Sequence, residues 1–356
     1  MKMLDFYHKD DFIKAPKMDA HMHYNVFDDT YIKYATDINV KLMMVNVDIG
    51  FSIEEQLNIS RTLKKKYPSQ FYFIGTFDPS GFNDMDFTEK TIRQINRCMK
   101  SGAQGIKIWK NIGMSIKDEQ GNYVMANHPA FMPIYAYLEN NKIPMLVHLG
   151  EPRNCWLPYD QITMRSELNY YRGYPEYHMH LHPEAPSYEE QIAVRDDILG
   201  KFPKLDLIGA HLGSLEWNVD EVAERFDQYP HFTIDISGRM GHIHLQAVKN
   251  HGKVYDFFMK YQDRIMYGSD LTFSLLGLRS KFYHIFAHKR FTRKNFSSFF
   301  TVWHDDWLFF ATGSEIPVEE TTLAGMPEKI KGLKLPKEVV DKIFYINACN
   351  IYHLEN

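Results

Sequence analysis

Short apolar runs alternate along this chain with longer segments in which hydrophobic residues recur at helical spacing. Apolar runs of this kind are typical of strands that are buried in a parallel sheet. The pattern predicts strands at residues 15–24, 40–47, 71–76, 105–110, 144–148, 207–211, 231–237 and 264–269. Between the strands it predicts helices at residues 52–67, 88–101, 129–140, 188–202, 219–229 and 247–261.

Residues at the helix ends agree with this alternation. Ser52 is a predicted N-cap with Glu55 three residues later, the pattern of a capping box. Gly102 follows the next helix, where a C-cap residue is expected. Eight successive β/α units indicate an α/β fold, a (β/α)8 TIM barrel. No repeat or low-complexity linker divides the chain, so we predict a single domain over residues 1–356.

Two connections are much longer than ordinary βα loops. Residues 151–187 follow the fifth predicted strand, and residues 271–335 follow the eighth. Connections of this length inside a compact domain are usually lids or functional elaborations. Both insertions leave from the C-terminal end of a strand, where barrel enzymes hold their active sites. We therefore expect both to lie over the catalytic face.

The first insertion concentrates tyrosines, tryptophan and arginines, among them Trp156 and Arg153. Apolar walls combined with guanidinium groups suit a lid over a small organic acid. The same residue types are enriched at subunit interfaces, so a contact within a homo-oligomer is the alternative.

Imidazole and carboxylate side chains end several of the predicted strands. His21 and His23 are two residues apart on the first strand and therefore point to the same face. His148 ends the fifth strand, and Asp270 ends the eighth. A set of three histidines and one aspartate suits zinc with a position left open for water. Manganese, iron and cobalt bind the same ligand types and remain open.

Asp19 lies on the same face of the first strand, one pleat deeper than His21. We expect it to accept a hydrogen bond from a ligand imidazole or from a neighbouring strand. The alternative for the whole set is a group of buried polar residues that only satisfy one another. Two further histidine clusters, at residues 178–182 and 242–244, end no apolar run, and we interpret them as loop histidines.

These motifs resemble the amidohydrolase superfamily, in the amidohydrolase 2 branch that contains aminocarboxymuconate-semialdehyde decarboxylase and related lactonases. The resemblance rests on residues 19–23, His148, residues 211–213, residues 268–270 and a C-terminal segment at residues 342–348. It implies that His21, His23, His148 and Asp270 hold the metal, and that His211 is a catalytic histidine beside it. Decarboxylating members often replace the first motif histidine with glutamate, so the histidine here favours hydrolysis.

The expected reaction is attack of metal-activated water on a lactone, amide or ester of a small organic acid. Asp270 is the expected proton carrier, and His211 is expected to orient the water or polarise the carbonyl. Metal-dependent decarboxylation of an aromatic or unsaturated acid is the alternative. Lys107 or Lys110 on the fourth strand would bridge two metals if carboxylated, but one divalent metal is favoured. Lys107, Arg153, Arg239 and Trp156 are the predicted substrate-binding residues.

Composition excludes some partners. The formal net charge is −4 and no basic stripe is present, which argues against nucleic acid as a partner. A nuclease on the same barrel would usually also carry a metal-bridging glutamate on the fourth strand. No stretch reaches the ~20 apolar residues of a membrane span. Three cysteines without a pairing pattern favour a reducing, cytoplasmic location.

Overall fold

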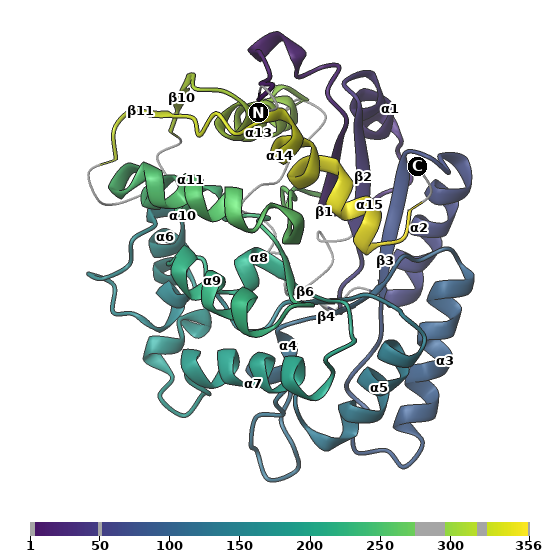
Figure 1. The fold of residues 1–356 in the computed structure, drawn as a ribbon. Helices are drawn as coiled ribbons and strands as arrows, with labels where there is room; N and C mark the ends of the chain where they lie inside the picture. Colours follow the sequence, from purple (N-terminus) through teal and green to yellow (C-terminus); the bar gives the residue numbers. More distant parts are fainter. Residues whose placement is uncertain (1–3, 49–51, 275–295, 319–325, 355–356) are drawn as a thin grey trace.

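A single curled parallel sheet organises the chain (Figure 1). The computed structural model describes residues 4–48, 52–274, 296–318 and 326–354. The sheet has nine strands in the order β8-β7-β6-β5-β4-β3-β2-β1-β9. Their bounds are β1(Lys17–Asn25), β2(Val40–Val45), β3(Phe71–Thr76), β4(Ile106–Ile108), β5(Met145–Val147), β6(Leu207–Gly209), β7(Thr233–Asp235), β8(Ile265–Met266) and β9(Thr272–Ser274). This is the predicted α/β TIM-barrel architecture.

The eighth predicted strand is divided in the structure. Residues 265–266 pair with β7, and the chain then crosses to the other end of the sheet, where β9 pairs in parallel with β1. The backbone between these strands also bonds to β1, since Ala20 N donates to Tyr267 O at 3.0 Å and His23 N donates to Leu271 O at 2.8 Å. The two ends of the sheet are thereby joined, and a continuous strand at 264–269 is wrong.

Helices surround the sheet in Figure 1. Most of the helices that the sequence predicts are present in the structure. The prediction of one helix at residues 247–261 is wrong, because the chain turns at Asn250 between two helices. The helices before the C-terminal segment are η1(Lys9–Asp11), α1(Thr30–Asp37), α2(Ile53–Lys66), α3(Phe87–Lys100), α4(Asn111–Met114), η2(Pro129–Phe131), α5(Met132–Asn140), α7(Tyr188–Lys201), α8(Ala210–Gly213), α9(Val219–Gln228), α10(Met240–Lys249), α11(His251–Lys260) and η6(Gln262–Arg264).

The predicted N-cap of α2 and the glycine after α3 are confirmed. The Ser52 side chain accepts a hydrogen bond from the backbone N–H of Glu55 at the start of α2, but the reciprocal bond of the predicted capping box, from the Ser52 backbone N–H to the Glu55 side chain, is absent from the described structure of this helix. Gly102 follows α3 with a φ of +96°, a conformation that residues with a side chain rarely adopt.

The insertion after β5 is mostly helical and contains η3(Arg153–Trp156), α6(Arg165–Gly173), η4(Pro175–Tyr177) and η5(Met179–Leu181). The later part of the chain contains α13(Phe296–Ala311), β10(Glu315–Pro317), β11(Lys329–Lys331), α14(Lys337–Asp341), the π-helix η10(Lys342–Ile346) and α15(Asn347–Ile351). Of the predicted insertion at residues 271–335, residues 275–295 and 319–325 lie outside the described residues.

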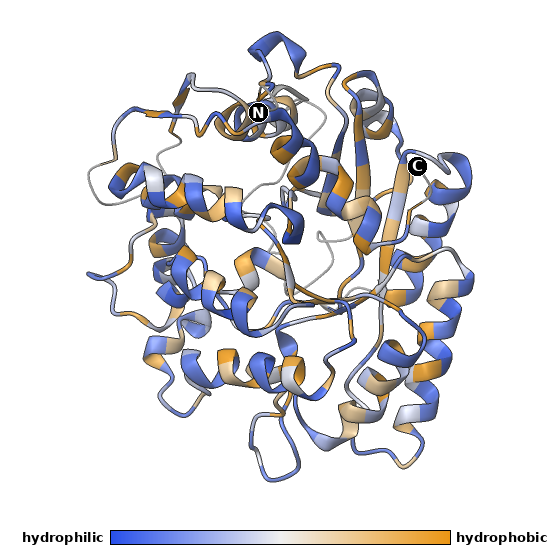
Figure 2. Ribbon diagram, viewed as in Figure 1, coloured by the Kyte–Doolittle hydropathy of each residue, from blue (hydrophilic) through white to orange (hydrophobic). Residues whose placement is uncertain are grey.

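Hydrophobic residues gather on the strands, as the orange colouring of β1 to β3 in Figure 2 shows. The strands are buried along almost their whole length, because helices pack outside the sheet and side chains fill its interior. Among the described residues, no helix is both long enough and apolar enough to cross a membrane.

Candidate active site

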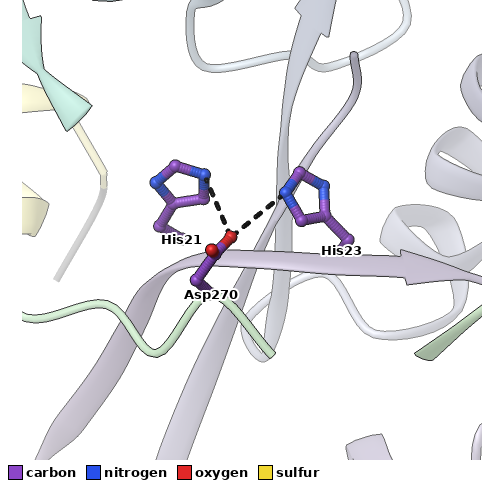
Figure 3. Close-up of side chains that lie close together, drawn as sticks. All are labelled: His21, His23 and Asp270. Carbon is purple, nitrogen blue, oxygen red and sulfur yellow. Dashed lines mark ion pairs between the residues drawn. The ribbon is translucent and has the colours of Figure 1, made fainter. Parts of the chain in front are cut away.

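The two histidines of β1 lie side by side near Asp270 (Figure 3). His21 Nε2 is 3.9 Å from Asp270 Oδ1, and His23 Nε2 is 3.4 Å from the same oxygen. The other ring nitrogen of each histidine is already bonded, His21 Nδ1 to Asp235 Oδ2 at 2.7 Å and His23 Nδ1 to the carbonyl of Val45 at 2.9 Å. Because these partners accept hydrogen bonds, both Nδ1 atoms carry a proton, and both Nε2 atoms face Asp270.

Asp270 occupies a tight turn just after β8. Its φ is +60°, and its backbone N–H donates to the carbonyl of His21 at 2.8 Å. The turn requires close approach of β1, because a Cβ atom at Gly268 would lie 2.7 Å from His21 Cβ. The sequence Gly268-Ser269-Asp270 therefore brings a carboxylate to the histidines of β1.

His211 follows β6 and lies against both His21 and His148. Its ring centroid is 4.9 Å from that of His21 and 4.4 Å from that of His148. Nδ1 donates to the carbonyl of Ser237 at 2.8 Å, so Nε2 is the lone-pair nitrogen. Its φ of +59° is uncommon for a residue with a side chain, and Asp235 Oδ1 accepts its backbone N–H at 2.9 Å.

His148 lies farther from the β1 histidines than the sequence suggests. Ligand atoms of His21, His23 and Asp270 all lie within 4.8 Å of one another, and His148 does not belong to that group. Its Nε2 atom is buried without a hydrogen-bond partner among the described residues. The structure therefore brings three of the four predicted ligands together, while the ring of the fourth, His148, packs against that of His211.

The donor set fits a divalent cation. His21 Nε2 is also buried without a hydrogen-bond partner among the described residues, a costly arrangement for a polar atom unless something binds it. Bonds that fix Nδ1 and direct Nε2 are typical of histidines that ligate metals. His21, His23 and Asp270 would hold the ion, with His148 and His211 within the same cluster of rings.

Burial sets the charge of these groups. It lowers the pKa of His148 and of His211 well below the usual value, with Arg239 adding to the effect at His211, so both rings are neutral near pH 7. Burial alone would raise the pKa of Asp270, but the neighbouring histidines hold it well below its usual range. Histidine ligates a metal as the neutral imidazole and aspartate as the ionised carboxylate.

A cavity of about 510 Å³ opens over this group. Its wall includes His23, His148, His211 and Asp270, so four of the predicted centre residues reach one space. Both insertions contribute to the wall, the first through Glu151, Pro152, Met164, Ser166, Glu167, Tyr170 and Tyr171, and the second through Thr301, Val302, Asp305, Asp306, Ile316 and Pro317.

Two of the predicted substrate-binding cations line the cavity. Lys107 is 1% exposed and has no ion pair with another described residue, and burial lowers its pKa to about 8. Arg239 donates to the carbonyl of Gly238 at 3.0 Å, while its Nε atom is buried without a partner among the described residues. Lys110 differs from both because it pairs with Glu151. Lys107 and Arg239 therefore remain available to an anion.

The other two predicted substrate-binding residues do not line the cavity. The Arg153 guanidinium lies 4.3 Å from the ring centroid of Trp217. Trp156 donates its indole N–H to the carbonyl of Pro186 at 3.1 Å and packs on Tyr188. In this structure both hold the insertion together.

A second polar group in the cavity wall joins α6 to α10. His242 Nε2 is 2.9 Å from Glu167 Oε1, and Asn154 Nδ2 donates to the other Glu167 oxygen at 2.6 Å. The interpretation of His242 and His244 as loop histidines is wrong, since both lie in α10. The segment at residues 178–182 consists of short 3₁₀ turns, and His178 is buried with Nε2 bonded to the carbonyl of Leu157.

Sequence reasoning also missed Asp235, which supports both His21 and His211. The available signal was a carboxylate between Ile234 and Ile236 inside a predicted buried strand, where a charged group requires a partner. Burial would raise its pKa, but His21 holds the carboxyl ionised.

A parallel barrel with imidazoles and a carboxylate converging at its strand ends defines a class of metal-dependent enzyme. A family model described as amidohydrolase matches residues 75–354. The chain therefore belongs to the amidohydrolase family, which confirms the resemblance seen in the sequence. The match begins after β1, so the histidines of that strand are placed by the structure.

Several solved structures are similar to this chain, and the first of the three described below supports the fold. An amidohydrolase II shares 15% identity with a TM-score of 0.52, covering 95% of this chain and 99% of that chain. 2,6-Dihydroxybenzoate decarboxylase from Rhizobium matches with 15% identity, a TM-score of 0.46 and coverage of 82% and 99%. Dihydroorotase from Saccharomyces cerevisiae in complex with 5-fluoroorotic acid matches with 12% identity, a TM-score of 0.49 and coverage of 96% and 84%. No curated protein matches.

Proposed function

We propose that this amidohydrolase is a metal-dependent hydrolase that cleaves a lactone, amide or ester of a small organic acid. The observation that carries the proposal is the convergence of His21 Nε2, His23 Nε2 and the Asp270 carboxylate at the cavity. One divalent ion, with zinc as the expected metal, would supply a water of lowered pKa and a polarised carbonyl when bound.

The neighbouring side chains have complementary roles in this reaction. Asp270 is ionised and accepts a proton from the attacking water, then returns it to the leaving group. His211 carries its proton on Nδ1, so Nε2 acts as an acceptor and orients the water. Polarising a carbonyl would require a proton on Nε2, which burial disfavours. Of the two roles considered for His211, the geometry supports the first.

The cations favour an anionic substrate. Lys107 and Arg239 both line the cavity, and the Nε atom of Arg239 has no hydrogen-bond partner among the described residues. Burial of the Lys107 ammonium group is costly, and a substrate carboxylate would offset that cost. The insertion at 151–187 supports the same proposal, because Tyr170 and Tyr171 supply aromatic surface to the cavity wall and would form part of a lid.

Lys107 also favours a second candidate, the metal-dependent decarboxylation of an aromatic or unsaturated acid. Its ammonium group affects the pKa of both His21 and His148, so it lies close to the centre itself. A carboxylate held at that position would be next to the reacting atoms. His21 in the first motif favours hydrolysis over this alternative.

A paired assay separates the two reactions. The zinc-loaded and manganese-loaded protein would be screened against lactones, amides, esters and aromatic or unsaturated acids, with acid release and CO₂ release recorded separately. Hydrolysis predicts acid release without CO₂ and a loss of turnover in Asp270→Asn. Metal-dependent CO₂ release without hydrolysis of any ester, amide or lactone would contradict the proposal and establish the second candidate.

A further inference from the structure

Asp19 is the centre of a buried hydrogen-bond network beneath the metal-ligand group. Its side chain is fully buried, and Oδ1 accepts the backbone N–H of Ser269 at 2.9 Å and that of His21 at 3.3 Å. Oδ2 accepts the Ser269 hydroxyl at 2.5 Å and the Trp303 indole N–H at 2.8 Å. Of the two partners expected for Asp19, a ligand imidazole or a barrel neighbour, the structure shows the barrel neighbour, because Ser269 follows β8.

Ser269 links Asp19 to the turn that contains Asp270. Its hydroxyl group donates to Asp19, and its oxygen accepts the backbone N–H of Leu271 at 3.0 Å. Asp270 lies between Ser269 and Leu271, and its φ of +60° is sparsely populated for a residue with a side chain. Such a conformation persists where surrounding bonds hold it. Three consecutive backbone N–H groups, at residues 269–271, donate to Asp19, His21 and Ser269.

Trp303 reaches this network from outside the barrel strands. It lies on α13, in the described part of the insertion after β8, and is 1% exposed. Its indole N–H shares Asp19 Oδ2 with the Ser269 hydroxyl, so it fixes the orientation of the carboxylate. A buried carboxylate that loses one of its donors is free to rotate toward the remaining ones.

We propose that Trp303 is a positioning residue for Asp270. Its N–H fixes Asp19, Asp19 fixes Ser269, and Ser269 holds the turn that presents the Asp270 carboxylate to His21 and His23. The proposal deepens the proposed function and rests on it only for the role of Asp270 in turnover, because the turn itself can be measured without metal or substrate.

Trp307 provides a matched control on the same helix. It is fully buried one turn after Trp303, and its Nε1 atom has no hydrogen-bond partner among the described residues. It packs on Tyr7 and Phe12, away from Asp19. Trp303→Phe and Trp307→Phe thus remove the same atoms, but only the first removes a hydrogen bond to the network.

The test is hydrogen exchange of the full-length, metal-free protein, followed in peptides that cover residues 268–271 and, as a reference, β3. Trp303→Phe is expected to speed exchange at residues 269–271 about tenfold, the size expected for loss of one hydrogen bond to a buried charge. Trp307→Phe is expected to leave these amides within about threefold of the parent. Trp303→Met, which removes the donor with a flexible side chain, is measured beside them in case Trp303→Phe does not fold.

Equal acceleration in both tryptophan variants, or acceleration that extends equally to β3, would overturn the proposal, because either result indicates packing alone. Turnover tests the consequence on a substrate found in the screen. Trp303→Phe is expected to lower kcat about tenfold with KM within about twofold, as for a misplaced catalytic group. If exchange changes selectively but kcat does not, Trp303 positions the turn, and it is the proposed role of Asp270 that fails.

Discussion

Two polar groups of the site are built in different ways. In the first group, His21 and His23 come from one strand, β1, and Asp270 comes from the turn that bonds directly to that strand. In the second group, Glu167 and His242 come from an insertion helix and a barrel helix, and they meet through a side-chain bond alone. Register fixes the first group, whereas packing between helices fixes the second.

This difference bears on the role expected for each group. Strand register places side chains reproducibly at the same edge of the barrel, as catalysis requires of groups that must act together. Residues on inserted helices vary more freely in sequence and position, as specificity for different substrates requires. We therefore propose that the reaction takes place at the strand ends and that the wall including Arg239 and α6 recognises the substrate.

The largest expected effect comes from removing both β1 histidines. His21→Ala with His23→Ala should reduce metal content to less than about a tenth of the parent, because two of the converging nitrogen ligands are lost. Elemental analysis after metal-supplemented purification measures this. The control is His180→Ala with His182→Ala, which removes the same motif from the first insertion and should leave metal content unchanged. Metal retained by the first variant would contradict the assignment.

Asp270→Asn separates the loss of turnover from the loss of metal binding. The amide cannot take up a proton near neutral pH, so kcat should fall about 10²–10⁴-fold. Metal content should fall less, because the histidines remain. Steady-state kinetics and elemental analysis on one preparation measure both quantities. Turnover within about threefold of the parent, with metal bound, would remove Asp270 from the chemistry.

In the Glu167–His242 pair, Glu167→Ala should mainly lower the free energy of unfolding. It leaves His242 and Asn154 without their partner at a site where the carboxylate is 17% exposed. Losing one member of such a group costs about 2–4 kcal/mol of unfolding free energy. Denaturant unfolding measures it, with Glu184→Ala, at an exposed position, as the control. Equal midpoints for the two variants would show that the pair does not hold α6 to α10.

Arg239→Met should act on substrate binding. Loss of one guanidinium contact to a carboxylate is expected to raise KM about tenfold while kcat changes little. Arg153→Met is the matched control, because Arg153 lies on Trp217 and does not line the cavity. If the two variants raise KM equally, the choice of Arg239 over Arg153 is wrong.

The sequence predicted the residues at the strand ends but not the contacts made by the inserted segments. Apolar runs predicted the sheet, and their terminal residues predicted His21, His23 and Asp270, because a strand has a fixed two-residue period. His148 obeys the same rule, yet its position relative to the others depends on barrel curvature, which no local pattern encodes. The Trp303–Asp19 bond and the Glu167–His242 pair join residues far apart in sequence, and each depends on how an inserted segment packs.

We propose that His21, His23 and Asp270 bind one divalent ion. Anomalous scattering from zinc-loaded crystals, recorded on both sides of the zinc absorption edge, would locate the ion. We expect one strong peak about 2.0–2.2 Å from His21 Nε2, His23 Nε2 and an Asp270 carboxylate oxygen. A peak at Glu167 and His242 instead, or no peak beside β1 at full zinc loading, would contradict it.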